Sequence, residues 1–562
     1  MTFRFRIVLV IFLVMFVAVF MRLFYWQIIR AEELSHLGRE QYGRNITLQP
    51  IRGEIRTSDG YPIVANKLTY LVYANPKVVE DPIHTTDVLS SFLEMDPASI
   101  SGQLALDRYW VPMAQTIDNE TKERVEKFNL PGIGFEEQGT RFYPEASMAA
   151  HILGFVGRGE EGSNKGYFGI EGYYDRQLRG KVGTELQLFD ALGRPIIDSS
   201  SQTASSMRGR NFTLHIDRAI QFILEDELKT GIKRYEAEGG MAAIMDPKTG
   251  SIVALAAFPA FDPRSYSGFE SEVYKNPFIT NTYEPGSTFK PLIMASAIDS
   301  GVLKADSICT ICDGPVEIGG YSIKTWNNEY YPNSTMIDVI KHSDNTGMVF
   351  VGQTLGLDKM LRYLEKFGIG QRTGIDLQGE VVPELRDKKS WYPIDLATAS
   401  FGQGISVTPI ELLSAFSSLA NEGIRMEPHV VKAVERDDGQ MIEIKPKEIE
   451  RTVSSKTAKI MTEILVTAVS AGEAKWAAPE GYRIAGKTGT AQIPIEGHYD
   501  PNQTIPSFIG FAPADDPKFV MLVVLDRPKT SIYGSETAAP IFFNVAKKLL
   551  LHYAIPPTEP IE

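Results

Sequence analysis

The sequence predicts a membrane-anchored α+β protein. It comprises an N-terminal transmembrane helix, an elongated mixed pedestal and a C-terminal domain with an antiparallel five-stranded sheet, flanking helices and a helical lobe. Three observations predict this arrangement: an apolar N-terminal run, a Ser-rich stretch near residue 200, and strand signals that enclose a long helical insertion. The chain of 562 residues also exceeds what one hydrophobic core usually organises, which favours two or more folded domains.

The apolar run covers residues 7–26, and Arg22 is its single charged residue. About 20 residues span a bilayer, and an arginine near one end can extend to the interface. A cleaved signal peptide is the alternative, but no small-x-small cleavage pattern follows, so we expect an uncleaved anchor. The short tail 1–6 carries Arg4 and Arg6, which favours a cytoplasmic N-terminus and an extracytoplasmic chain beyond the inner (plasma) membrane.

Residues 27–210 are expected to form the pedestal, because they are rich in turn signals and in short alternating runs such as 68–74. No catalytic constellation is visible there. The Ser-rich stretch 199–210 indicates a linker, so the main boundary is placed there, with a second domain over 211–555 and a tail over 556–562.

The second domain begins with a helical pattern and ends with another, and strands lie between them. A hairpin is expected across the turn Asp-Pro-Lys-Thr-Gly, because two apolar runs flank it. The predicted elements are helix 217–228, strands 241–245 and 251–256, strands 484–491, 507–512 and 519–525, and helix 537–553.

Composition argues against several ligands. The formal net charge of -13, with both signs mixed along the chain, makes nucleic acid an unexpected partner. The eight histidines show no ligand spacing and no Gly-rich phosphate loop is present, so neither a metal nor an organic cofactor is expected. Cys309 and Cys312 form a half-site without a second pair of ligands. We expect a structural or incidental role for them, with a local disulfide as an open alternative.

Ser287 and Lys290 form the first candidate for chemistry. Pro285-Gly286 breaks the chain before Ser287, and a helical pattern follows, so Ser287 should lie in the first turn. Residues three apart share a helix face, which places the Lys290 amine near the Ser287 hydroxyl. For Lys290 to act as a base near neutral pH, burial or a second cation must lower its pKa.

Two further elements follow along the chain. Ser343-Asp344-Asn345 comes at the end of the helix-like run 335–342, and Lys487-Thr488-Gly489-Thr490 lies within a strand signal. A glycine inside a strand is unfavourable unless something approaches the backbone closely, and a substrate strand along that edge would do so. Each element alone is typical of ordinary structure.

Together and in this order, these elements resemble the Ser-x-x-Lys, Ser-x-Asn and Lys-Thr-Gly set of penicillin-binding proteins and serine β-lactamases. The resemblance implies that Ser287 attacks the penultimate D-alanine carbonyl of a peptidoglycan stem peptide and is acylated by penicillin. It implies that Lys290 takes the proton, Ser343 relays protons between the lysines and Asn345 holds the donor amide. It implies a substrate-binding strand segment, with the D-alanyl carboxylate on Lys487, Thr488 and Thr490, beside Gly489. The backbone N–H groups of Ser287 and Thr490 would form an oxyanion hole, worth about 100- to 1000-fold in rate per donor.

Further motifs are similar to those of class B, monofunctional penicillin-binding proteins. In the pedestal these are Arg52-Gly53-Glu54-Ile55 with Ala65-Asn66, Arg141-Phe142-Tyr143-Pro144, and Gly169-Ile170-Glu171. The chain departs from the family at Thr57-Ser58, where the family usually has Asp-Arg. Ser400-Phe401-Gly402-Gln403-Gly404 also fits, and the segment 507–513 looks like the division-specific branch, although a sporulation relative would look similar.

The resemblance also implies partners, because no glycosyltransferase domain is visible in the pedestal. A polytopic lipid II polymerase would supply glycan strands, together with other septal proteins. A D,D-carboxypeptidase or serine β-lactamase is the alternative function, and a non-catalytic penicillin-binding scaffold or sensor is a second. The pedestal and anchor argue against the first, and the complete set of polar residues argues against the second.

Overall fold

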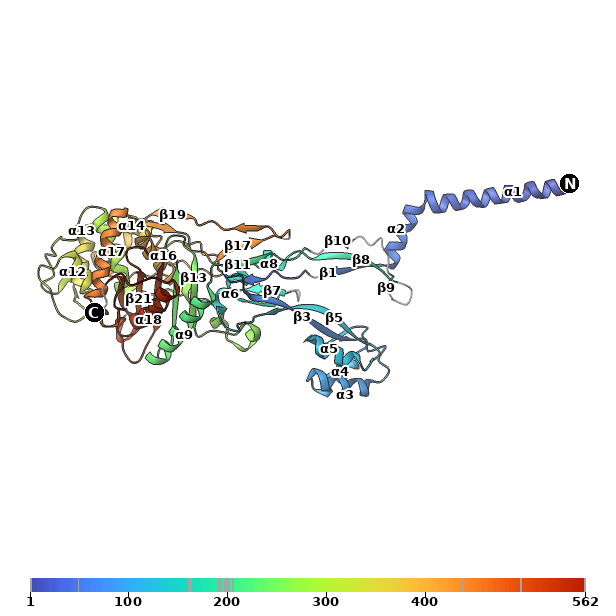
Figure 1. The fold of residues 1–562 in the computed structure, drawn as a ribbon, viewed down its shortest axis with the longest axis horizontal. Coiled ribbons are helices and arrows are strands. Elements are labelled where there is room, and N and C mark those ends of the chain that lie inside the picture. The colour runs from blue at the N-terminus through green and yellow to red at the C-terminus, as the bar shows by residue number, and fades with distance from the viewer. Residues whose placement is uncertain are drawn as a thin grey trace. The chain divides into compact units, whose positions relative to one another are not determined.

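The computed structural model describes residues 3–48, 50–159, 164–189, 195–196, 203–204, 207–436, 438–495 and 498–559. These residues form two compact units. Figure 1 labels the helices and strands along the chain. The first unit draws on Met1–Arg52 and Arg179–Gly209, and the second on Gly53–Leu178 and Arg210–Glu562. Half of the predicted linker 199–210 lies outside the described residues.

The first unit contains the predicted membrane helix. Helix α1 (Phe3–Phe24) continues into a π-helical turn (Tyr25–Ile29), and this segment of 27 residues is long and apolar enough to cross a membrane. Helix α2 (Ala31–Tyr42) leads into a small antiparallel sheet. Its strands are β1 (Gly43–Leu48), β8 (Gly183–Phe189), β9 (Pro195–Ile196) and β10 (Thr203–Ala204).

The second unit begins with a seven-stranded sheet that combines early and late parts of the chain. The strands run in the order β18-β17-β11-β2-β3-β4, and β5 pairs with β3. Their bounds are β2 (Ile55–Arg56), β3 (Pro62–Ala74), β4 (Val111–Ile117), β5 (Ile133–Phe142), β11 (Asn211–Leu214), β17 (Val431–Glu435) and β18 (Met441–Glu443).

Short helices and one hairpin complete this region. Apolar side chains of β3, β4, α3, α4 and α5 share a small core. The sequence pattern predicted strand character here but missed the helices. They are α3 (Pro82–Leu93), α4 (Pro97–Leu104), α5 (Asn119–Glu126), α6 (Ala150–Leu153), α7 (Gly169–Tyr173) and α8 (Asp175–Arg179), and the hairpin is β6 (Phe155–Arg158) with β7 (Asn164–Tyr167).

Polar residues from three predicted pedestal motifs meet in this region. The Arg141 guanidinium donates a 2.6 Å hydrogen bond from Nε to Oε1 of the fully buried Glu171. Its Nη1 donates to Asn66 Oδ1 at 3.0 Å. A buried ion pair needs such additional hydrogen bonds, because its desolvation is costly. The motifs therefore share a structural role in holding β3, β5 and α7 together.

The predicted five-stranded antiparallel sheet is confirmed. It runs in the order β13-β12-β22-β21-β20, so β20 is an edge strand. The strands are β12 (Gly239–Met245), β13 (Ile252–Phe258), β20 (Ala485–Ile495), β21 (His498–Ala512) and β22 (Phe519–Asp526). Their order follows from the chain ends, because β12 from the start of the domain pairs with β22 from its end.

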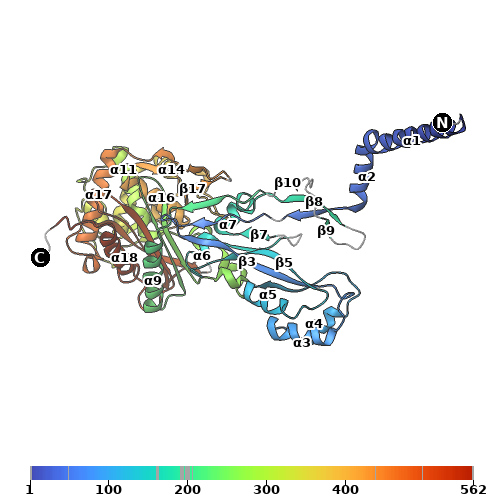
Figure 2. The ribbon, with the colours of Figure 1, turned by 45° about the vertical axis from the view of Figure 1, so that its right-hand side comes forward.

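Alternate residues of β22 separate two cores, as the period of two in a strand requires. Val520, Leu522 and Val524 face the core shared with the helical lobe. Met521 and Val523 face the core of α9 (Arg218–Tyr235) and α18 (Ala538–His552), which pack together against the sheet (Figure 2).

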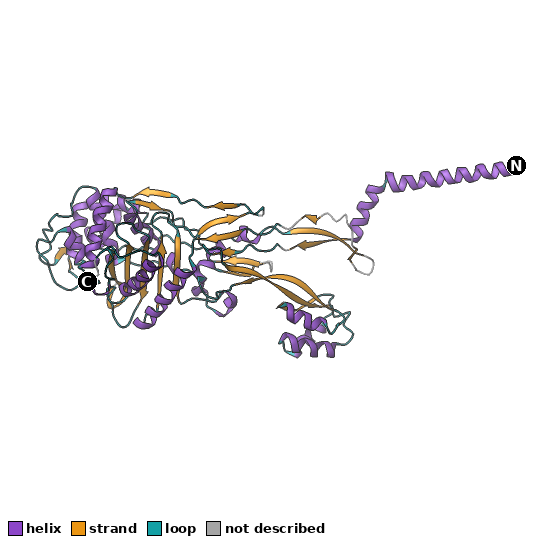
Figure 3. Cartoon of the chain, in the orientation of Figure 1, coloured by secondary structure: helices purple, strands orange, loops and turns teal. Residues whose placement is uncertain are grey.

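The helical lobe lies between the strand groups in sequence and is rich in helices, drawn in purple in Figure 3. Its main helices are α10 (Pro277–Thr280), α11 (Lys290–Asp299), α12 (Met336–Lys341), α13 (Asn345–Leu355), α14 (Leu357–Phe367), α15 (Pro393–Ala399), α16 (Pro409–Ala420) and α17 (Ser455–Ser470). The minor strands are β14 (Val316–Ile318) with β15 (Tyr321–Ile323), and β16 (Ile424–Met426) with β19 (Glu448–Arg451).

Short 3-10 turns also occur, at Pro263–Gly268, Ser271–Tyr274, Gly286–Phe289, Lys388–Ser390 and Lys475–Ala477.

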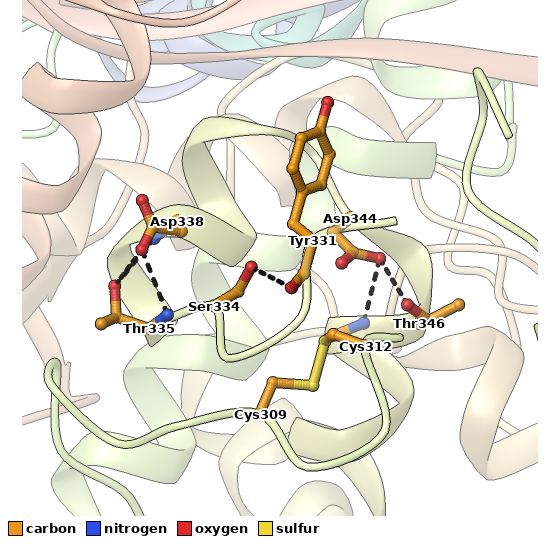
Figure 4. The surroundings of a disulfide bond; sticks show 9 residues. Cys309, Cys312, Tyr331, Ser334, Thr335, Asp338, Asp344 and Thr346 are labelled. Carbon is orange, nitrogen blue, oxygen red and sulfur yellow. Dashed lines mark hydrogen bonds between the residues drawn. A yellow bond between two sulfur atoms is a disulfide. The ribbon is translucent and has the colours of Figure 1, made fainter. Parts of the chain in front are cut away.

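Cys309 and Cys312 form a disulfide within one loop of this lobe (Figure 4). Both side chains are buried in the lobe's core. The Cys309 N–H donates to the Ser334 carbonyl at 2.8 Å, and this ties the loop to the segment before α12. The structural role expected from the sequence therefore takes the form of the local disulfide.

Candidate active site

Ser287 lies in a 3-10 turn (Gly286–Phe289) that leads directly into α11. Gly286 has a φ of +55°, and its N–H donates to the Gly402 carbonyl at 3.0 Å. A Cβ at Gly402, whose φ is +81°, would lie 2.2 Å from the Gly286 carbonyl oxygen. The loop around Gly402 therefore packs directly against this turn and fixes the position of the Ser287 backbone.

Lys290 is the first residue of α11 and is fully buried. Its Nζ lies 2.5 Å from the Ser343 carbonyl oxygen, 2.8 Å from Asn345 Oδ1 and 3.3 Å from Ser343 Oγ. A neutral amine has two N–H donors and one lone pair. The two shorter contacts can use both donors, which leaves the lone pair for the Ser343 hydroxyl.

Ser343 joins the nucleophile to both lysines. It lies between α12 and α13 with a φ of +55°, and the following Asp344 caps α13. This turn directs the Ser343 hydroxyl to 3.0 Å from Ser287 Oγ and 3.0 Å from Lys487 Nζ. One hydroxyl is therefore within hydrogen-bond distance of Ser287, Lys290 and Lys487.

Asn345 is the first residue of α13 and contacts Lys290. Its Oδ1 accepts from Lys290, and its Nδ2 donates to the Lys324 carbonyl at 3.1 Å. These two bonds fix the orientation of the side-chain amide. The same amide thus has one group committed to the lysine and the other to a loop of the lobe.

Lys487 and Thr488 belong to edge strand β20. The Lys487 ammonium has three acceptors: Ser343 Oγ at 3.0 Å, Thr488 Oγ1 at 3.2 Å and the Thr488 carbonyl at 3.4 Å. Three acceptors match the three hydrogens of a protonated lysine. On its other edge, β20 pairs with β21 in a register that places Lys487 opposite Ile509.

Burial and the second cation together lower the pKa of Lys290. Burial is the larger cause, and the charge of Lys487 adds to it, so the pKa of Lys290 is lowered well below its ordinary value. Burial also lowers the pKa of Lys487, but the Glu473 carboxylate opposes this shift. The electrostatics therefore favour a neutral Lys290 beside a protonated Lys487.

The structure gives a different explanation for the glycine at position 489 from the one that the sequence suggested. A Cβ there would lie 2.5 Å from Ser507 Oγ and 2.8 Å from Thr288 Cγ2. This packing alone requires a glycine, so a substrate strand is not needed to explain it. Next to it, the Thr490 hydroxyl accepts from the Gly534 N–H at 3.1 Å, which ties the edge strand to the loop before α18.

Sequence reasoning missed Glu473, which lies after α17 in the loop that leads to β20. Its Oε2 accepts a 3.2 Å hydrogen bond from the Thr488 hydroxyl. No motif marked this residue, because its distance along the chain from Ser287 and Ser343 gives no sign of contact. Within the part of the chain that the structure describes, no group of His, Cys, Asp and Glu side chains is arranged to hold a metal ion.

Comparison with known proteins agrees with this geometry. Residues 240–547 match the penicillin-binding protein transpeptidase domain, and residues 47–214 match the penicillin-binding protein dimerisation domain. The chain is 34% identical to stage V sporulation protein D of Bacillus subtilis, over 99% of this chain and 86% of that protein. It is 30% identical to peptidoglycan D,D-transpeptidase FtsI of Escherichia coli, over 89% of this chain and 84% of that protein.

A solved peptidoglycan synthetase from Bifidobacterium adolescentis has the same fold. It is 25% identical and superposes with a TM-score of 0.74, covering 92% of this chain and 98% of that one. The chain therefore belongs to the penicillin-binding proteins. Within that family it is a membrane-anchored class B member, a serine-type peptidoglycan D,D-transpeptidase whose transpeptidase domain binds stem peptides and β-lactams.

Proposed function

We propose that Ser287 is the acylated nucleophile and that Lys290 is its base, acting through Ser343. The observation that carries this proposal is the Ser343 hydroxyl, which lies 3.0 Å from Ser287 Oγ and 3.3 Å from Lys290 Nζ. Ser287 Oγ forms a bond to the penultimate D-alanine carbonyl carbon while its proton passes to Ser343, and the Ser343 proton passes to Lys290. The same route in reverse protonates the amine of the departing D-alanine as its C–N bond breaks.

The edge of β20 is the proposed donor site. Thr490 is assigned to the terminal D-alanyl carboxylate, with the Lys487 ammonium as the nearby positive charge. The Thr488 hydroxyl, expected from the sequence to share this role, donates to Glu473 at 3.2 Å instead. The backbone N–H groups of Ser287 and Thr490 are assigned to the carbonyl oxygen that becomes negative in the tetrahedral intermediate. Asn345 is assigned to the donor amide. The position of β20 as the terminal strand of the sheet supports this geometry, because an extended peptide can pair with an edge strand.

Cross-link analysis tests this function. The full-length chain, together with a lipid II polymerase and lipid II, should produce D,D-cross-linked muropeptides and release one D-alanine per cross-link. Ser287→Ala should produce only uncross-linked glycan. Release of D-alanine without cross-links would instead support the D,D-carboxypeptidase alternative.

We also propose the placement and division of the chain. The N-terminal tail 1–6 is cytoplasmic, helix 7–26 crosses the inner membrane, and both the pedestal 27–210 and the catalytic domain 211–555 lie outside the cytoplasm. The Arg residues of the tail support this orientation, and the two matched domains, 47–214 and 240–547, support the division. Cysteine labelling at the tail and in an exposed catalytic-domain loop with an impermeant reagent tests the orientation: only the loop should react in intact cells.

The division septum is the proposed site of action, with a polytopic lipid II polymerase and other septal proteins as partners. The relative peptidoglycan D,D-transpeptidase FtsI of E. coli supports this placement. Another relative, stage V sporulation protein D, favours a role in sporulation instead. Depletion in growing cells distinguishes the two. Filamentation is expected, whereas normal growth with defective spores would assign the chain to sporulation.

A further inference from the structure

A chain of hydrogen bonds continues beyond the lysine pair and ends on a carboxylate. From Ser287 it passes through the Ser343 hydroxyl to Lys487 Nζ, then to the Thr488 hydroxyl at 3.2 Å. The Thr488 hydroxyl donates to Glu473 Oε2, also at 3.2 Å. A hydroxyl has one hydrogen, so donation to Glu473 leaves only acceptor lone pairs facing Lys487.

The residues on both sides of Glu473 are closely packed. Gly472, immediately before it, is packed so closely that a Cβ would lie 2.1 Å from the Ala468 carbonyl oxygen and 3.1 Å from that of Lys341. Ala474, immediately after it, is buried. The loop is therefore closely packed between the ends of α17 and α12, and the Glu473 side chain reaches Thr488 of β20.

Only one of the two Glu473 carboxylate oxygens accepts a hydrogen bond from the described residues. Its second oxygen, Oε1, is buried and has no hydrogen-bond partner among the described side chains and backbone groups. A buried acceptor without a partner is costly, which makes a charge at this place hard to explain as packing. The charge has a use if it acts on the buried cations nearby.

The charged groups around Glu473 come from several elements. Lys487 lies on β20, Lys290 on α11, Asp344 at the start of α13 and His342 at the end of α12; the charge of Glu473 acts on both lysines and on His342. For Lys290, the charge of Asp344 opposes burial more strongly than that of Glu473 does. For Lys487, Glu473 is the carboxylate that opposes burial. The two carboxylates therefore act unequally on the two lysines.

We propose that Glu473 is a positioning residue that keeps the shared proton of the lysine pair on Lys487. Through the Thr488 hydroxyl it keeps three acceptors around the Lys487 ammonium, and its charge compensates the buried cation. Lys290 then stays neutral, with its lone pair toward Ser343. This inference rests on the proposed role of Lys290 as the base, and it adds the reason why the proton is on the other lysine.

The pH profile of acylation tests this role. The full-length chain in detergent is mixed with a fluorescent penicillin, and the second-order rate constant of acylation is measured from pH 5 to 10. The wild type should give a bell, because acylation needs a neutral Lys290 on the acid side and a protonated Lys487 on the alkaline side. In Glu473→Gln the alkaline limb should move to lower pH by about 1 unit or more, because an opposite charge has been removed. At a pH above the alkaline limbs of both proteins, the acylation rate constant of Glu473→Gln should therefore be about tenfold lower than that of the wild type.

Two further variants separate charge from packing. Glu463→Gln removes the same charge from α17, where Glu463 is exposed and paired with Arg483 at 2.7 Å, and its profile should match the wild type. Glu473→Asp retains the charge, so its alkaline limb should stay closer to the wild type than that of Glu473→Gln. The pH of the alkaline limb does not depend on the amount of protein, so this comparison can be made even if one of the Glu473 variants is expressed at a low level.

Two results would overturn the inference. In one, the Glu473→Gln profile superimposes on that of the wild type; in the other, Glu473→Asp shifts as far as Glu473→Gln, which would mean that shape rather than charge is responsible. A wild type that is not acylated at any pH would instead refute the proposed function, so the two failures are distinguishable.

Discussion

Replacement of Ser343 by Ala should separate catalysis from stability. The hydroxyl contacts Ser287, Lys290 and Lys487, but each lysine keeps other partners without it. Lys290 retains the Ser343 carbonyl at 2.5 Å and Asn345 at 2.8 Å, and Lys487 retains the two oxygens of Thr488. The loss in folding free energy should therefore be that of a typical hydrogen bond, about 0.5–1.5 kcal/mol.

The effect on acylation should be much larger. Without the hydroxyl, the proton of Ser287 has no direct path to Lys290, so the general-base contribution is lost. Such contributions are typically about 100- to 10,000-fold, which corresponds to about 2.7–5.5 kcal/mol of activation free energy. The assay is the rate constant of acylation by a fluorescent penicillin, alongside thermal unfolding of the same samples.

Ser296→Ala is the matched control. Ser296 is buried on the same helix as Lys290, and its hydroxyl donates to the Leu292 carbonyl at 2.7 Å, away from the site. Its acylation rate should equal that of the wild type. An acylation rate for Ser343→Ala within threefold of the wild type, with the fold intact, would refute the proposed relay.

Three other predictions follow from the same geometry. Gly489→Ala should slow acylation at least tenfold and destabilise the fold by about 1–3 kcal/mol, because the new Cβ meets Ser507 and Thr288 beside the nucleophile. The control is Gly139→Ala, where a Cβ meets nothing within 4 Å. In the same acylation and unfolding assays, the control should show neither effect. Acylation should reach its plateau at a lower pH than an ordinary lysine would allow, because burial and the charge of Lys487 lower the pKa of Lys290. A rate that still rises tenfold per pH unit toward pH 10 would show an ordinary lysine. The double change Cys309→Ala and Cys312→Ala should lower the free energy of unfolding by about 2 kcal/mol, as expected for a short closed loop. The acylation rate should not change. A fall in the acylation rate would instead link this loop to the site.

Local patterns predicted the elements that bear the nucleophile and lysines. The break at Pro285-Gly286 and the apolar run after it placed Ser287 in the turn that leads into α11, and alternation placed Lys487 on a strand. These signals are local because turns and strand periodicity are encoded by neighbouring residues.

Long-range pairings could not be predicted in this way. Strands β17 and β18 join the sheet of the pedestal region although they lie more than 200 residues beyond β11 in the chain. The hydrogen bond from Thr488 to Glu473 likewise depends on where a loop returns to the sheet, and neither residue type signals it. Register and loop placement are set by tertiary packing, which a single sequence does not reveal.

The most direct test of the central claim is the mass of the intact full-length chain after incubation with benzylpenicillin, followed by peptide mapping. The account predicts one stable adduct, located on Ser287, and no adduct in Ser287→Ala. An adduct on another residue, or labelling that persists in Ser287→Ala, would contradict the assignment of the nucleophile. Hydrolysis of the penicillin without a lasting adduct would contradict the transpeptidase mechanism and favour a β-lactamase.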